Sequence, residues 1–293
     1  MAVIRTSGLS KFYGRVRGIE ALDLEVQKGE IFGFLGPNGA GKTTTIRLLI
    51  GLLHPTSGGA EILGQEAGST EARRSIGYVP GEVAFYQEMT GDELLALLGR
   101  FHQGDFQKRQ QYLASKLDLD LKRPIRGYSR GMKQKLAIIQ ALRHDPELLI
   151  LDEPTLGLDP LVQREFYSLL MEEKARGKTV FLSSHILPEV ERVADRVGIV
   201  REGRLAAVEE VGTLKLKKVR RLQLWLREEV PAQALEMEGV DVLSRQGKHL
   251  ELAVHGHIDR LLPWLSRLPV EEMVFAEASL EDTFMKFYRK ETG

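Results

Sequence analysis

The stretch Gly36-Pro37-Asn38-Gly39-Ala40-Gly41-Lys42-Thr43 decides the fold, because it matches the pattern G-x-x-x-x-G-K-[S/T]. A continuous apolar run at 31–35 precedes it, and apolar residues at helical spacing follow it at 44–52. A strand, a glycine-rich loop and a helix in this order begin an α/β unit. The loop and its context predict a site for a nucleoside triphosphate.

The residue types of this loop explain how it would hold phosphate groups. Glycines let the backbone curl so that successive amide N–H groups point at phosphate oxygens, and the positive end of the following helix adds to the attraction. Lys42 would reach the β and γ phosphates as a point charge, and the Thr43 hydroxyl would coordinate Mg²⁺. The residues predicted to contact the nucleotide here are Gly36, Pro37, Asn38, Gly39, Ala40, Gly41, Lys42, Thr43 and Thr44.

A second element of the predicted site is the apolar run 148–151, which ends in Asp152 and Glu153. An unpaired buried carboxylate is costly, so two adjacent acids at the end of a core strand indicate that a ligand is bound there. We predict that Asp152 holds Mg²⁺, usually through water, and that Glu153 orients and deprotonates the attacking water as general base. The alternative, a solvated strand end, is disfavoured by the phosphate loop upstream.

Composition bounds the class of protein. The chain has 293 residues, 43% of them hydrophobic, which suggests about two globular domains. Its 41 basic and 41 acidic residues give a net charge of zero, so we expect no nucleic-acid partner. The absence of cysteine excludes disulfides, thiol catalysis and Cys-ligated zinc. With no membrane span and no secretory signal visible, the sequence predicts a cytoplasmic protein.

The pattern of predicted elements divides the chain unequally. Residues 1–212 alternate short strands, such as 180–183 and 197–200, with helices, as α/β domains do. Within them, helical patterns dominate residues 86–145, where Thr90-Gly91-Asp92-Glu93 has the form of a capping box. A turn at Glu202-Gly203 predicts a hairpin that closes this domain.

Residues 213–293 predict a small α+β domain. Apolar residues alternate with polar ones on two predicted strands and recur at helical spacing on two predicted helices, the last of them capped by Ser279. The apolar positions are Leu222, Leu224, Leu226, Leu250, Leu252 and Val254 on the strands, and Ile258, Leu261, Leu262, Leu265, Leu280, Phe284, Phe287 and Tyr288 on the helices.

The order of motifs resembles that of the ATP-binding-cassette (ABC) ATPases. Pro154 and Gly157-Leu158-Asp159 follow the acidic strand, and Ser184-His185 follows the next predicted strand. Tyr128-Ser129-Arg130-Gly131-Met132-Lys133-Gln134 is similar to the family's signature stretch in its S-x-G-M-x-Q form. The resemblance runs from about residue 3 to 211. It implies a P-loop NTPase ABC ATPase core with a helical subdomain, followed here by the small C-terminal α+β domain.

The resemblance also implies ATP and Mg²⁺ as cofactors and adds site residues. Tyr13, or its neighbour Phe12, would stack on adenine. His185 would bridge the γ-phosphate and Glu153. The predicted catalytic residues are therefore Glu153, His185 and Lys42. The remaining predicted contacts involve a second subunit: Ser129, Gly131 and Met132 would face the γ-phosphate of its ATP, and Asp159 would lie across the interface.

One phosphate loop and one signature imply a partner cassette, since each complete site takes one of each from different subunits. The resemblance therefore implies a dimer, a copy of the chain being the expected partner, that drives a separate integral membrane permease from the cytoplasmic face. The stretches 80–82, 128–132 and 278–284 resemble the antibiotic and multidrug exporter branch. The alternatives are a soluble ABC protein acting on ribosomes or DNA, and a transporter ATPase for lipid, polysaccharide or ion.

Some positions depart from the family pattern. The family commonly has Gln where this chain has Gly81, so Glu82 or Gln87 could substitute for it. Arg130 stands where many members have Gly, and we expect it to face solvent. The basic run 215–221 could contact lipid headgroups or the permease, although a solvated linker is at least as good an interpretation.

Overall fold

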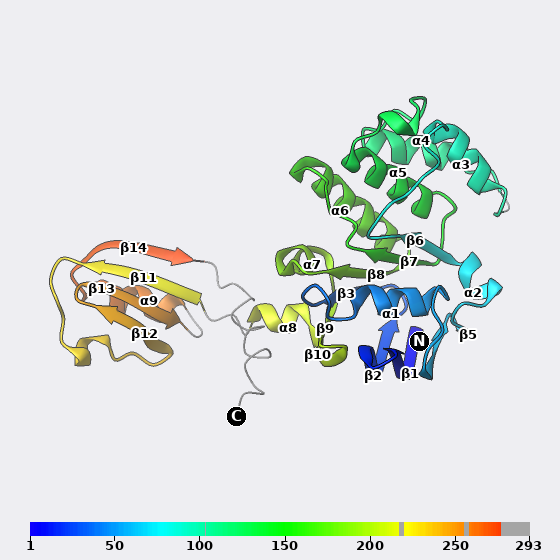
Figure 1. The fold of residues 1–293 in the computed structure, drawn as a ribbon. Coiled ribbons are helices and arrows are strands. Elements are labelled where there is room, and N and C mark those ends of the chain that lie inside the picture. Colours follow the sequence, from blue (N-terminus) through cyan, green and yellow to red (C-terminus); the bar gives the residue numbers. More distant parts are fainter. Residues whose placement is uncertain (103, 217–219, 255–257, 277–293) are drawn as a thin grey trace. The chain divides into compact units, whose positions relative to one another are not determined.

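The computed structural model describes residues 1–102, 104–216, 220–254 and 258–276 (Figure 1). The chain forms two compact units, Met1–Glu210 and Val211–Gly293, so their division lies two residues before the boundary predicted from the sequence. Among the described residues, no helix has the length and apolar character needed to span a membrane.

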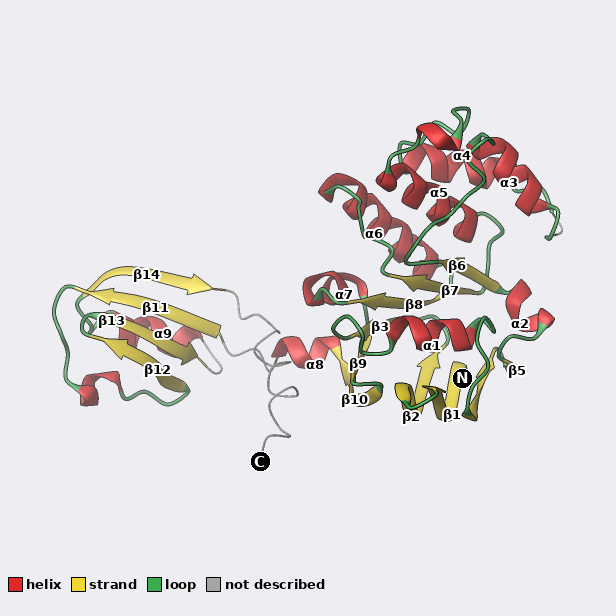
Figure 2. Cartoon of the chain, in the orientation of Figure 1, coloured by secondary structure: helices red, strands yellow, loops and turns green. Residues whose placement is uncertain are grey.

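A six-stranded sheet with the order β10-β9-β3-β8-β7-β6 forms the centre of the first unit (Figures 1 and 2). Its five strands from β9 to β6 run parallel, and only β10 is antiparallel. Parallel strands bury both faces, which explains the continuous apolar runs of the sequence. The strands are β3 (Ile31–Leu35), β6 (Ile76–Val79), β7 (Leu148–Asp152), β8 (Thr179–Ser184), β9 (Arg196–Arg201) and β10 (Arg204–Glu210).

Each face of this sheet is covered by its own apolar core. Side chains of alternate residues go to opposite faces, so Leu149 and Leu151 of β7 join one core while Leu148 and Ile150 join the other. The second core also packs against α1 and a smaller antiparallel sheet with the order β2-β1-β4-β5. The strands of the smaller sheet are β1 (Ala2–Tyr13), β2 (Val16–Gln27), β4 (Ser57–Ile62) and β5 (Gln65–Glu66), and the helices in this part of the chain are α1 (Lys42–Leu49) and α2 (Thr70–Arg74).

Helices cover the other face, as the helical pattern over 86–145 predicts. The capping box forms at the start of α3, where Thr90 and Glu93 exchange side-chain and backbone hydrogen bonds. The predicted hairpin also forms, with Glu202 and Gly203 both at positive φ between β9 and β10. The helices are α3 (Gly91–Gly99), α4 (Gln107–Lys116), α5 (Arg130–Leu142), α6 (Pro160–Ala175) and α7 (Leu187–Val193), with a 3₁₀ turn, η1, at Ile125–Gly127.

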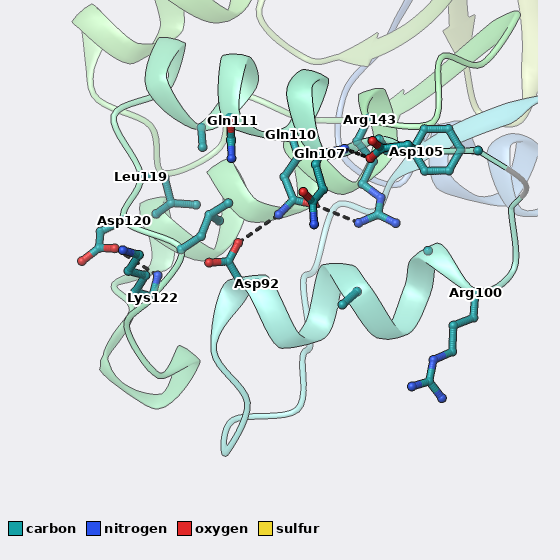
Figure 3. A pocket seen from close by; sticks show the side chains of 16 residues that line it. Asp92, Arg100, Asp105, Gln107, Gln110, Gln111, Leu119, Asp120, Lys122 and Arg143 are labelled. Carbon is teal, nitrogen blue, oxygen red and sulfur yellow. Dashed lines mark hydrogen bonds between the residues drawn. The ribbon is translucent and has the colours of Figure 1, made fainter.

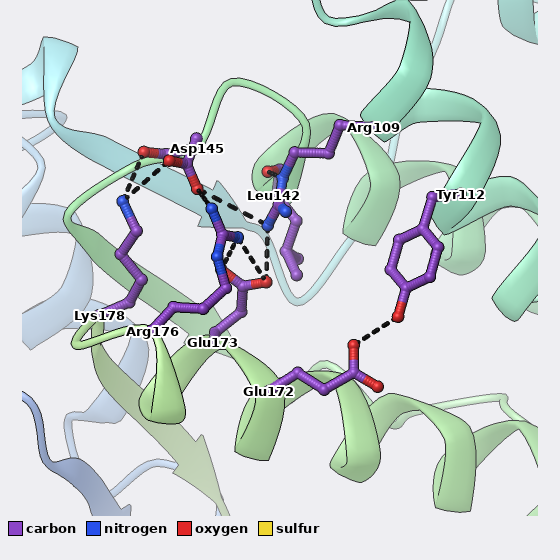
Figure 4. Close-up of polar contacts among 8 residues, drawn as sticks. All are labelled: Arg109, Tyr112, Leu142, Asp145, Glu172, Glu173, Arg176 and Lys178. Carbon is purple, nitrogen blue, oxygen red and sulfur yellow. Dashed lines mark hydrogen bonds and ion pairs between the residues drawn. The ribbon is translucent and has the colours of Figure 1, made fainter.

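An ion cluster ties α4 to α6 and to the turn after α5 (Figure 4). The carboxylate of Glu173 is 4% exposed and contacts Arg109 Nη2 at 2.6 Å and Arg176 Nη1 at 3.2 Å. Asp145, in the turn, contacts Arg176 at 2.7 Å and Lys178 at 3.2 Å. Opposite charges therefore compensate one another where the helical subdomain meets the sheet.

The second unit is a four-stranded antiparallel sheet with the order β12-β13-β11-β14. The alternating leucines and valine predicted to face its core are buried, together with Leu261 and Leu265 of α9. The predicted helix capped by Ser279, the whole of the stretch 278–284 and part of the basic run lie outside the described residues. The elements are α8 (Val211–Leu216), β11 (Arg220–Leu226), η2 (Ala232–Leu235), β12 (Val240–Gln246), β13 (His249–Val254), α9 (Ile258–Leu265) and β14 (Val270–Ala276).

Candidate functional site

The phosphate loop joins the end of β3 to the start of α1. Gly41 caps the helix with φ of 104°, and a Cβ there would lie 2.6 Å from Ile19 Cγ2 and 2.7 Å from Gly18 O, so only glycine fits. Lys42 is 5% exposed, and its amine donates to the carbonyl oxygens of Gly36 at 2.7 Å and Pro37 at 3.1 Å. Two carbonyl oxygens of the loop thus hold the amine of its own lysine.

The acidic end of β7 faces this loop. Asp152 is 1% exposed, and its Oδ1 accepts a hydrogen bond from Ser183 Oγ at 2.7 Å. Glu153 follows with φ of 47°, in the left-handed region. Its Oε1 lies 3.2 Å from Lys42 Nζ and its Oε2 lies 2.9 Å from His185 Nδ1. The three residues predicted to be catalytic are therefore in direct contact.

The oxygen donors at this edge fit a magnesium ion. Asp152 offers a carboxylate and Thr43 offers a hydroxyl, and Mg²⁺ in nucleotide sites takes one or two protein oxygens and completes its shell with phosphate and water. No cluster of three or more His, Cys, Asp or Glu able to hold a metal exists among the described residues.

The signature residues lie at the start of α5. Ser129 is its N-cap, and its hydroxyl accepts a hydrogen bond from Met132 N at 3.2 Å. Gly131 packs against the loop after β7, where a Cβ would lie 2.8 Å from Gly157 O. Within the described part of the chain, no hydrogen bond or ion pair joins Ser129 or Met132 to the phosphate loop. The contacts of these residues are within α5 and with the loop after β7.

The remaining predicted residues have local structural roles or exposed positions. Asp159 caps α6 by accepting from Leu161 N at 3.1 Å and Val162 N at 3.0 Å. Tyr13 ends β1 with 46% of its surface exposed, and Lys11 Nζ lies 5.6 Å from its ring centroid. The exposed ring of Tyr13 is accessible to the adenine of a bound nucleotide. The interface position of Asp159 stays a prediction.

Further residues lie around the acidic strand. Ser183 contacts Asp152, and the buried amide of Gln134 donates from Nε2 to Pro154 O at 2.9 Å. Gly81, at the position where the family has Gln, is beside the acidic strand, since a Cβ there would lie 3.4 Å from Asp152 Oδ2. Burial, with a contribution from the charge of Asp152, raises the pKa of Tyr78 to about 12. Gly81 and Gln134 belong to stretches that can be compared with the family pattern, whereas only their three-dimensional neighbours distinguish Ser183 and Tyr78 from ordinary strand positions.

A separate cavity of about 690 Å³ lies in the helical subdomain between α3 and α4 (Figure 3). There Gln110 donates to Asp92 Oδ1 at 2.9 Å and accepts from Arg143 Nη1 at 3.1 Å. None of the predicted nucleotide contacts lines this cavity. This cavity is therefore distinct from the site formed by the phosphate loop and the acidic strand.

Comparison with known proteins agrees with this geometry. The family model described as "ABC transporter" matches residues 19–156. The bacitracin transport ATP-binding protein BcrA of Bacillus licheniformis is 38% identical, with 97% of this chain and 96% of that protein covered. The chain belongs to the ABC transporter ATP-binding proteins. As an ABC cassette it binds ATP and is an ATPase, which confirms the family, fold and enzyme class predicted from the motifs.

Other ABC relatives match about 70% of this chain. The linearmycin resistance ATP-binding protein LnrL of Bacillus subtilis is 36% identical over 70% of this chain and 68% of its own length. A solved ATP-binding subunit of an ABC transporter has a TM-score of 0.69 and 33% identity, covering 73% of this chain and 92% of that one. A dimeric ATP-binding cassette bound to ADP and Pi, 23% identical, has the same fold with a TM-score of 0.66 over 71% of this chain and 98% of that one.

Proposed function

We propose that this ABC ATPase dimerises with a second copy of itself around two ATP molecules and powers a separate membrane permease from the cytoplasmic face. The observation that carries the proposal is the direct contact of Glu153 with Lys42 and His185 beside the phosphate loop. The single signature and single phosphate loop of the chain support dimerisation, because in the family each complete site combines the signature residues of one copy with the phosphate loop of the other. A second copy would bring them to that loop.

In the proposed mechanism each residue acts on one part of the triphosphate. The amides of the phosphate loop and Lys42 bind the phosphates. Thr43 and Asp152 would hold Mg²⁺, which would supply neutralisation of the phosphate charge. Glu153 accepts a proton from the attacking water. His185, 2.9 Å from Glu153 Oε2, orients that carboxylate and meets the γ-phosphate. Ser129, Gly131 and Met132 of the second copy close the site, and Tyr13 stacks on adenine.

We infer the cargo class from the relatives. The similarity to BcrA extends through the second unit, whereas the match to LnrL covers less of the chain. Both names refer to antibiotics, so we propose export of drugs, antibiotics or other hydrophobic compounds. In this arrangement the cargo contacts the permease and not this subunit.

The test is the Glu153→Gln variant, which removes the base and keeps the shape of the side chain. We expect ATP binding to persist, turnover to fall by at least about 100-fold, the lower range for loss of a positioned general base, and an ATP-bound dimer to accumulate. Nucleotide binding, phosphate release and size-exclusion chromatography measure these three properties. Hydrolysis at the wild-type rate would refute the assignment of the base, and a monomer under all conditions would refute the dimer.

The permease is tested by affinity purification of the tagged Glu153→Gln variant from detergent-solubilised membranes of the native host. We expect a polytopic membrane protein to co-purify in the presence of ATP. Recovery of ribosomes or DNA in its place, lost on raising the salt concentration, would contradict the transport role.

A further inference from the structure

Ser183 lies at the carboxyl end of β8, in register with Asp152 of the neighbouring strand β7. Its side chain is 0% exposed. The hydroxyl donates to Asp152 Oδ1 at 2.7 Å and accepts from the backbone N–H of Glu153 at 3.2 Å. One hydroxyl therefore joins the carboxylate proposed to hold Mg²⁺ to the backbone of the proposed base.

The hydrogen bond between the Glu153 N–H and the Ser183 hydroxyl helps to hold the backbone of Glu153 in a strained conformation. A non-glycine residue with φ of 47° persists only when its surroundings hold it, and such residues concentrate at functional sites. The N–H of Glu153 lies between two acceptors of the same residue, the hydroxyl and the carbonyl oxygen of Ser183, both at 3.2 Å. The turn that directs the Glu153 carboxylate toward Lys42 and His185 is thus fastened to β8.

The contact with Asp152 distinguishes the two oxygens of its carboxylate. Oδ1 is occupied by the Ser183 hydroxyl. Oδ2 is on the side of Gly81, and no hydrogen bond or ion pair within the described residues engages it. A carboxylate held by one oxygen presents the other in a fixed direction.

We propose that Ser183 is a positioning residue, which selects Oδ2 of Asp152 for the metal and holds the turn that directs Glu153. The inference rests on the proposed roles of Asp152 and Glu153 and deepens them. The next residue, Ser184, is a matched control, because it is also buried at 3% exposure but its hydroxyl donates to Glu189 Oε2 at 2.8 Å.

The experiment measures Mn²⁺ binding to the full chain in the presence of ADP, by electron paramagnetic resonance. A hydrogen bond to a charged group corresponds to about a 10-fold to 100-fold change in an equilibrium constant. We expect Ser183→Ala to weaken Mn²⁺ binding by about 10-fold or more, while metal-free ADP binding stays within about 2-fold of wild type. Ser184→Ala should leave both affinities unchanged, whereas a general loss of structure would weaken both.

The Asp152→Ala variant separates this inference from the function on which it rests. Normal Mn²⁺ binding by Asp152→Ala would refute the metal role of Asp152. Weak binding by Asp152→Ala together with normal binding by Ser183→Ala would overturn the role of Ser183 and leave the proposed function standing. If the Ala variant does not fold, Ser183→Thr and Ser183→Val replace it. Thr and Val have side chains of the same shape, but only Thr keeps the hydroxyl. Equal Mn²⁺ affinities for the two variants would therefore overturn the inference.

Discussion

Replacing Arg109 by Met tests how strongly the ion cluster attaches α4 to α6 (Figure 4). Arg109 and Glu173 contact at 2.6 Å with side-chain exposures of 20% and 4%. Removing one partner of a buried pair costs about 3–5 kcal/mol, because the other charge stays buried without compensation. Arg176 still contacts Glu173 at 3.2 Å, so we expect the lower end of that range, about 3 kcal/mol. For a unit of this size that lowers Tm by about 6–12 °C.

The assay is a calorimetric melt of the full chain, with Arg126→Met as the matched control. Arg126 pairs with Glu88 at 3.5 Å with exposures of 66% and 85%, and pairs of this kind contribute at most about 1 kcal/mol. We also expect Glu173→Gln to recover part of the lost Tm when added to Arg109→Met, since no carboxylate then stays uncompensated. Equal shifts for Arg109→Met and Arg126→Met would refute the reasoning.

Three further outcomes follow from the site and the helical subdomain. Lys42→Ala should weaken ATP binding by about 10-fold to 100-fold in a direct binding titration, and unchanged affinity would overturn the phosphate-loop assignment. Ser129→Arg should keep ATP binding by the single subunit and abolish hydrolysis, so normal phosphate release would contradict the shared site. Burial lowers the pKa of His144 from 6.5 to about 4, and the neighbouring ring of His102 adds to the shift. The folded state therefore favours neutral His144, and the protein loses stability as the pH falls from 6.5 toward 4. Thermal melts at pH 6.5 and pH 4 should show a smaller drop in Tm for His144→Gln than for the wild type.

The parts of the site that could be predicted from sequence are those set by topology. Parallel strands bring their carboxyl ends to one edge of the sheet, so residues that follow β3, β7 and β8 must meet there. That geometry explains why Lys42, Glu153 and His185 are in contact although they come from distant parts of the chain. The capping box and the hairpin were predictable for a similar reason, since each depends on only a few adjacent residues.

The parts that could not be predicted depend on strand register and on side-chain conformation. Ser183 is one of two serines before His185, and only the pairing of β7 with β8 shows which of them faces Asp152. The bond from Gln134 to Pro154 likewise depends on how α5 packs on the sheet. The capping role of Asp159 depends on adjacent residues only. An Asp followed by Pro is a typical start of a helix, and Asp159 is the N-cap of α6 in the structure.

The backbone of Glu153 places function and stability in opposition at one position. A left-handed conformation costs a residue with a side chain roughly 1–2 kcal/mol relative to glycine. Gly at position 153 would remove that backbone cost, but it would also remove the carboxylate that lies 3.2 Å from the buried amine of Lys42, and the protein would lack its general base. The left-handed turn is therefore a backbone cost that accompanies the carboxylate it directs toward Lys42 and His185, and the ion pair with Lys42 offsets that cost within the site itself.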